Sequence, residues 1–186
     1  MKGYNIMCDL YKFLSEEAVG LHKNYLDNLK LEYSILEKSI PEIKNMSFRE
    51  IWRAKKLIYK EEILRLKVDI ECHKLFFSSF GNEYQQSKII KDLYGSEASF
   101  MYEISTEVKK WHNGGFLIIG ILNGAVYKYV GYDLTDIFIK SNPILAIDLC
   151  EHSYFLDFGF DKVSYFDNAL KYLNLSKIDK FLACKD

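Results

Sequence analysis

The arrangement of apolar and polar residues predicts a chain that is helical over roughly its first 80 residues. Ser15 followed by two glutamates is typical of a helix start, because a serine oxygen caps free amides and acids suit the first turn. Apolar residues then recur at roughly helical spacing until Pro41 interrupts them: Leu21, Tyr25, Leu29, Leu31, Ile35 and Leu36. We expect a new helix after Ser47 and a longer one from about residue 68 to 80, where a Gly-Asn pair ends it.

The following segments change from helices to strands. Helices are expected at residues 87–94 and 97–111, with a Gly-Ser break between them. Residues 116–122 and 125–130 are apolar runs on either side of Asn123-Gly124. Asn-Gly favours a two-residue type I′ turn, so this pattern predicts a β-hairpin.

A third apolar run opens at Pro143 and ends at Asp148. The amphipathic segments after it place these residues on their apolar faces: Tyr154, Phe158, Tyr165, Phe166, Leu170 and Leu173. Helices, then a small sheet, then helices predict an α+β fold. We expect an N-terminal helical hairpin lobe at residues 1–82. A C-terminal lobe at residues 83–186 would hold a three-stranded antiparallel sheet flanked by helices.

The composition is that of a globular protein, with 49% hydrophobic and 16% aromatic residues. The net charge is −1 and the two signs are interspersed, which gives no general attraction for nucleic acid or membrane surfaces. We therefore expect neither as a partner. No CxxC spacing occurs among the cysteines, which argues against a zinc knuckle and fits a reduced compartment. The four cysteines are Cys8, Cys72, Cys150 and Cys184.

No segment has the pattern of a targeting or membrane-spanning sequence. The start of the chain lacks the apolar stretch of a signal peptide, and the longest apolar run, residues 116–122, is far too short to cross a bilayer. We expect a soluble protein of the cytoplasm or of an organelle interior.

The strongest candidate for chemistry is the end of the third apolar run. Asp148 and His152 are four residues apart there, so a turn into a helix brings the imidazole back beside the carboxylate. Such a pair suits iron, manganese or zinc. The alternative is an aspartate that starts a helix and a core histidine satisfied by a hydrogen bond.

The order Asp-x-x-Glu-His-x-Tyr after an apolar strand resembles the C-terminal metal motif of the iron/manganese superoxide dismutase family. Ser15 to His22 is similar to the first-helix motif of that family, and Cys72 to Phe77 to its second-helix motif. Smaller similarities are Tyr94-Gly-Ser, Gly114-Gly-Phe and the ending Leu-Ala-Cys-Lys. The resemblance implies superoxide dismutation at one iron or manganese ion per subunit. Its implied ligands are His22, His73, Asp148 and His152.

Two histidines have other interpretations. His22 with Tyr25 is also similar to a histidine and gateway tyrosine found a little later in the family, and one histidine cannot fill both positions. Tyr25 would then line the substrate entrance. His112 follows a tryptophan at a helix end, which favours a surface or capping role.

The residues around the implied metal depart from the family pattern. Cys150 stands where the family usually has tryptophan, and Phe116 and Ile118 replace two more. The glutamine that bonds the metal-bound solvent has its nearest counterpart at Tyr132, or at Asp133 if the loop shifts. A glutamine that other members carry on the second helix falls at Asp69. Because such contacts set the redox potential, activity is expected to be low.

Glu151 is retained, and the resemblance implies that it reaches the last histidine of a partner subunit in a homodimer. The alternative is an ordinary exposed glutamate in a first helical turn. The next position of the motif, Phe155, replaces a family tyrosine.

Three functions compete at this point. The first is an iron- or manganese-dependent superoxide dismutase. The second is a catalytically silent relative that serves as a structural or interaction subunit of a larger assembly. The third, a hydrolase that uses the Asp/His metal site, is disfavoured because no additional general base is evident. The sequence favours neither iron nor manganese.

Overall fold

The computed structural model describes residues 10–184, so Cys8 and the start of the chain lie outside the described residues. The N-terminal part contains η2 (Leu10–Lys12), α1 (Glu16–Ser39), η3 (Pro41–Asn45), α2 (Phe48–Arg53) and α3 (Lys60–Ser78). The middle contains α4 (Lys88–Tyr94), α5 (Glu97–Lys110), β1 (Phe116–Leu122), β2 (Ala125–Gly131), α6 (Thr135–Lys140) and β3 (Asn142–Asp148). The C-terminal part contains η4 (Glu151–Ser153), α7 (Phe155–Phe158), α8 (Lys162–Leu170) and α9 (Ser176–Ala183).

Serine caps fix the starts of four helices. The hydroxyls of Ser15, Ser47, Ser87 and Ser96 each accept a hydrogen bond from a backbone amide three residues later. At Ser47 the cap is reciprocal, because a Glu50 carboxylate oxygen accepts from the Ser47 amide at 2.7 Å. The predicted starts after Ser15 and Ser47 are confirmed.

Two helical segments differ from the expectation. Helix α3 begins at Lys60 rather than near residue 68, because its charged first turns consist of strong helix formers that carry a weak apolar pattern. Helix α6 is a single short element of six residues between β2 and β3, which the sequence pattern did not predict.

The sheet is antiparallel, with the strand order β2-β1-β3. Asn123 and Gly124 both have positive φ, 50° and 84°, as a type I′ turn requires. The predicted hairpin and the predicted α+β class are confirmed. At the far end of the hairpin, Phe116 of β1 pairs with Asp148 of β3, which places the carboxylate at the end of the sheet.

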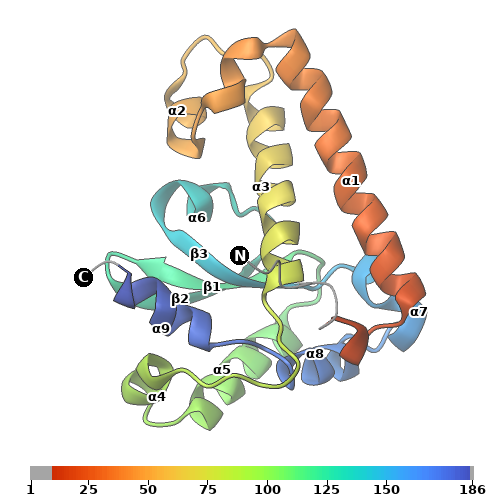
Figure 1. The fold of residues 1–186 in the computed structure, drawn as a ribbon, viewed down its shortest axis with the longest axis vertical. Coiled ribbons are helices and arrows are strands. Elements are labelled where there is room, and N and C mark those ends of the chain that lie inside the picture. Colours follow the sequence, from red (N-terminus) through yellow and green to blue (C-terminus); the bar gives the residue numbers. More distant parts are fainter. Residues whose placement is uncertain (1–9, 185–186) are drawn as a thin grey trace, which may run out of the picture.

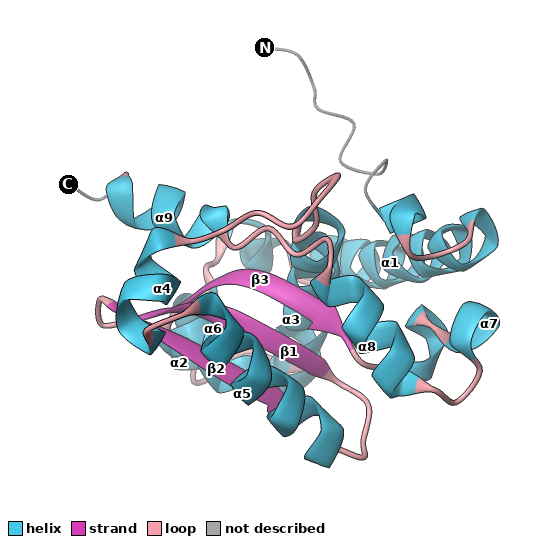
Figure 2. Cartoon of the chain, turned by 90° about the horizontal axis from the view of Figure 1, so that it is seen from below, coloured by secondary structure: helices cyan, strands magenta, loops and turns pink. Residues whose placement is uncertain are grey.

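Helices cover both faces of the sheet. Helices α3 and α6 lie on one face, and α4, α5, α8 and α9 lie on the other (Figures 1 and 2). Helix α1 packs along α3 on the side away from the sheet (Figure 1). One hydrophobic cluster includes Phe76 of α3, Leu117 of β1 and Tyr165 of α8, and so contains residues from both sides of position 82. The division into lobes at that position stays a prediction.

The end of α3 is tied to the open edge of the sheet through a buried hydroxyl. Ser79 is fully buried, and its Oγ accepts a hydrogen bond from the Ala146 amide of β3 at 2.8 Å while donating to the Leu75 carbonyl. Strand β3 is an edge strand, so an amide that points away from β1 needs a partner from outside the sheet.

Replacing Ser79 with alanine should lower the free energy of unfolding by about 1–3 kcal/mol, since a buried amide loses its acceptor. Ser78→Ala is the matched control, because among the described residues this half-buried hydroxyl bonds only the Leu75 carbonyl of its own helix. Urea unfolding followed by circular dichroism measures both variants. Equal losses would show that the bond to Ala146 contributes nothing of its own.

Candidate metal centre

Four side chains from four separate elements converge at the end of the sheet. They are His22 of α1, His73 of α3, Asp148 of β3 and His152 of η4, and we call them the four-residue cluster. The Nε2 atoms of the three histidines lie 3.2, 3.5 and 3.1 Å from Oδ2 of Asp148, in chain order. All four donor atoms lie within 4.8 Å of one another.

These separations suit one metal ion. Donor atoms about 2.1 Å from an ion lie about 3.0 Å apart at a right angle and about 3.6 Å apart at 120°. The buried Nε2 atoms of His22 and His73 have no hydrogen-bond partner among the described residues. Buried polar atoms are nearly always satisfied, so two unpartnered imidazole nitrogens that face a buried carboxylate fit a ligand set.

Packing within the helical hairpin holds two of the histidines. The His22 ring stacks on Phe76 with its centroid 4.5 Å away, and meets His73 edge-on at 5.0 Å. Phe116 contacts His73 edge-on at 5.3 Å. His22 and His73 are 1% and 2% exposed, so both rings are sealed between α1, α3 and the start of β1.

The chain after β3 folds tightly enough to return His152 to Asp148. The Cys150 amide donates to Oδ1 of Asp148 at 2.8 Å, and the Ser153 amide then donates to the Cys150 carbonyl. The predicted turn into a helix is a 3-10 turn, η4, rather than an α-helix. The Nε2 of His152 thereby lies 3.1 Å from Oδ2 of Asp148, within hydrogen-bond distance.

A second set of contacts orients the cluster. The Nδ1 of His73 lies 2.7 Å from the Asp69 carbonyl, which can only accept, so Nδ1 carries the proton and the Nε2 lone pair is free. The Tyr165 hydroxyl donates to the Asp148 backbone carbonyl at 2.8 Å. The apolar pattern of the sequence predicts for Tyr165 only a place on an apolar face. A tyrosine at a fully buried position usually indicates such a bond, because its hydroxyl needs a partner.

Burial and hydrogen bonds shift the pKa values of three members of the cluster. Burial favours the neutral acid, but the hydrogen bond from His152 and the close approach of His22 hold the pKa of Asp148 well below its usual range. Burial lowers the pKa of His73 to about 4. Burial also opposes the charged form of His152, yet its bond to Asp148 and that carboxylate's charge raise its pKa. A metal ion would therefore compete with a proton for the His152 imidazole.

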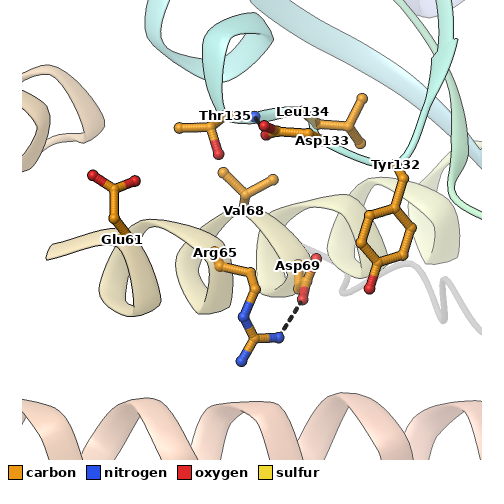
Figure 3. A pocket seen from close by; sticks show the side chains of 8 residues that line it. All are labelled: Glu61, Arg65, Val68, Asp69, Tyr132, Asp133, Leu134 and Thr135. Atoms are coloured by element: carbon orange, nitrogen blue, oxygen red, sulfur yellow. Dashed lines mark hydrogen bonds and ion pairs between the residues drawn. The ribbon is translucent and has the colours of Figure 1, made fainter. Parts of the chain in front are cut away.

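A pocket of about 340 Å³ lies beside the cluster, along α3. Figure 3 shows the side chains that line it: Glu61, Arg65, Val68, Asp69, Tyr132, Asp133, Leu134 and Thr135. Arg65 and Asp69 form an ion pair at 3.5 Å. Burial raises the pKa of the Asp69 carboxyl to about 6, against the effect of Arg65. Tyr132 and Asp133 lie at this pocket rather than in the cluster.

The two predicted tyrosines occupy different positions. The Tyr25 ring stacks on His152, with centroids 4.6 Å apart, and lies 5.2 Å from His73. It is half-exposed, so it separates the cluster from solvent. Tyr132 is 71% exposed, and its hydroxyl makes no hydrogen bond with a described residue.

The remaining predicted residues lie around the cluster or away from it. Glu151 is exposed beside His152, whose side chain is about one-third exposed. Cys150 packs against the start of β1, where the Gly115 amide lies 3.1 Å from its Sγ. His112 is exposed and lies outside the cluster. No described helix is both long and apolar enough to span a membrane.

Comparison with known families identifies the C-terminal part of the chain. The family described as iron/manganese superoxide dismutases, C-terminal domain, matches residues 82–181. Asp148 and His152 lie within the match, whereas His22 and His73 precede it. A search of curated proteins gave no match.

Replacing Tyr165 with phenylalanine should lower the free energy of unfolding by about 1–3 kcal/mol, since the Asp148 carbonyl loses its buried donor. Tyr154→Phe is the matched control. Its ring is buried and stacks on Tyr165, but its hydroxyl has no hydrogen-bond partner among the described residues. Guanidinium unfolding measures both variants, and a loss in the control as large as that in Tyr165→Phe would contradict the assignment.

Proposed function

We propose, from the premise that the chain belongs to the iron/manganese superoxide dismutase family, that it dismutes superoxide with one iron or manganese ion per subunit. His22, His73, Asp148 and His152 would be the ligands. The observation that supports the proposal is the convergence of three imidazole Nε2 atoms on one oxygen of a fully buried carboxylate.

A bound ion of this kind supplies one-electron chemistry between its +2 and +3 states. His22, His73 and His152 would hold the ion through imidazole nitrogens and Asp148 through a carboxylate oxygen. Asp148 supplies the single negative charge of the set, which offsets part of the ion's charge in both states. The Asp69 carbonyl keeps the proton on Nδ1 of His73, so that Nε2 remains a donor.

Two features lie on the approach to the cluster. Arg65 is exposed at the neighbouring pocket, where Asp69 pairs with it at 3.5 Å and Glu61 and Asp133 also line the wall. Tyr25 covers His152 and narrows the approach, as expected of an entrance residue. Superoxide needs no larger binding surface than this.

A homodimer is the second part of the proposal. Near Glu151, the segment around α7 exposes Phe155, Leu156 and Phe160, whose exposed fractions are 46%, 49% and 86%. Exposed apolar side chains gathered in this way are typical of a protein interface. We infer that Glu151 accepts a hydrogen bond from His152 of the partner subunit, which would strengthen that imidazole as a ligand.

A catalytically silent relative, acting as a structural or interaction subunit of a larger assembly, is the alternative function. Tyr132, the nearest counterpart of the missing solvent-bonding amide, is largely exposed and bonds nothing at the cluster, which favours this alternative. In addition, Phe116 is the aromatic residue that meets His73, and Cys150 provides no aromatic wall. Activity should therefore be low even with every ligand in place.

The purified protein should contain about one iron or manganese ion per chain, and His73→Ala should lose most of it because a ligand is removed. His112→Ala is the matched control, since this histidine is exposed and outside the cluster. Elemental analysis measures retention. Equal metal contents in the two variants would contradict the proposed ligand set.

The same three proteins, loaded with iron and separately with manganese, should dismute superoxide slowly, with His73→Ala inactive and His112→Ala unchanged. Superoxide consumption measured by stopped flow gives the rates. A fully metallated protein that is no faster than buffer would leave the silent subunit as the function.

Replacing Glu151 with alanine should weaken both dimerisation and metal retention, because each site would depend on the other subunit. Glu83→Ala, at another exposed glutamate far along the chain, is the control. Sedimentation velocity and elemental analysis measure the two properties. A monomeric wild-type protein that keeps its metal would make Glu151 an ordinary charge of a first helical turn.

A further inference from the structure

A second pocket, of about 530 Å³, lies away from the four-residue cluster. It is formed by residues of α2, the turn between β1 and β2, and the end of α6. Helix α2 lies above α6 on the left side of Figure 1, and the two helices are in contact. The residues that line it are Arg49, Trp52, Arg53, Leu122, Asn123, Ile139 and Lys140. Nothing in the proposed dismutase function uses them.

The pocket is positively charged although the whole chain is not. Arg49, Arg53 and Lys140 line it, and no carboxylate does. The chain between residues 49 and 60 carries five Lys/Arg and a single Glu, whereas the net charge of the protein is −1. That glutamate, Glu50, is held in the capping box of α2.

An acidic side chain next to the pocket reduces this charge. Asp136 forms an exposed ion pair with Lys140 at 2.6 Å. Exposed pairs of this kind are weak, so Lys140 can exchange Asp136 for a stronger anion. The two arginines form no ion pair with a described carboxylate.

Two features give the pocket a defined shape. Arg49 is fixed, because its Nε donates to the Ile139 carbonyl at 2.7 Å while its terminal nitrogens stay available. Trp52 is 51% exposed, and its indole has no aromatic partner among the described residues. A free indole face beside a held guanidinium is suited to stacking an aromatic ring.

We propose that this pocket binds a nucleoside polyphosphate. Arginine and lysine bind phosphate oxygens through charge-assisted hydrogen bonds, and a guanidinium does so with two donors. Trp52 supplies a stacking surface for the base. The volume is within the range of sites that hold small organic ligands.

This site is separate from the proposed metal centre. Strand β1 begins at Phe116, which pairs with Asp148, and ends at Leu122, which lines the pocket. A strand of seven residues spans about 20 Å, so the two sites lie at opposite ends of the sheet. Nucleotide binding is therefore testable whether or not the protein dismutes superoxide.

The test is calorimetric titration of the whole purified protein with ATP at about 0.15 M salt, where weak surface attraction is screened. Binding of one ATP per chain is expected. The double variant R53Q/K140Q should bind at least tenfold more weakly. The control K88Q/K91Q removes two exposed lysines of α4 and should stay within twofold of wild type. Equal weakening in both double variants, or no ATP binding by wild type, would overturn the proposal.

Further titrations test the role of the indole. Trp52→Phe should keep most of the affinity and Trp52→Ala should lose at least fivefold, with circular dichroism confirming that each variant is folded.

ATP should bind more tightly than either tripolyphosphate or adenosine. Tripolyphosphate binding as tight as ATP would reduce the pocket to a site for anions alone. A single-stranded oligonucleotide that binds more than tenfold more tightly than ATP would make this face a nucleic-acid surface instead. Either result would overturn the proposal.

Discussion

The buried carboxylate of Asp148 is the constraint on which the site and much of the fold depend. Its side chain is fully buried and its low pKa keeps it charged, a state that is costly unless partners surround it. Those partners come from three other elements: His22 of α1, His73 of α3 and His152 of η4. A bound ion would replace weak contacts between these groups with four bonds, and so would join the helical hairpin to the sheet.

The backbone around this carboxylate is held as firmly as its side chain. The Cys150 amide donates a hydrogen bond to Oδ1 of Asp148, and the Tyr165 hydroxyl donates to the Asp148 carbonyl. The Ser79 hydroxyl accepts from the Ala146 amide on the outer edge of β3. The remaining oxygen, Oδ2, faces the three imidazoles. Each of these contacts removes a direction in which Asp148 could move, which is how a site gains accurate geometry from ordinary hydrogen bonds.

The two ends of the sheet differ in chemistry. At one end, helices and aromatic rings bury three of the four metal-type donors, while His152 stays partly exposed under the half-exposed ring of Tyr25. At the other end, short elements leave arginines, a lysine and an indole open to solvent. The net charge of −1 does not reveal the basic pocket, because acidic residues elsewhere in the chain balance the basic segment before α3.

The sequence by itself determined the features that depend on neighbouring residues. Serine caps and the Asn123-Gly124 turn are local, because each rests on hydrogen bonds or φ values within a few residues. The strand that ends at Asp148 was predicted from its apolar run, although its backbone pairs with β1. The family motifs selected the four residues of the cluster. The early start of α3 escaped prediction because its first turns consist of strong helix formers with a weak apolar pattern. The short helix α6 escaped because a helix of six residues depends on packing rather than on its own pattern. Only the tertiary structure decided that His22 lies against Asp148, since the sequence allowed two interpretations of that histidine. It also decided that Tyr132 lies at the neighbouring pocket and that Trp52 lines a second pocket together with the end of α6. Such contacts join residues far apart in the chain, and only the packing of helices against the sheet sets them.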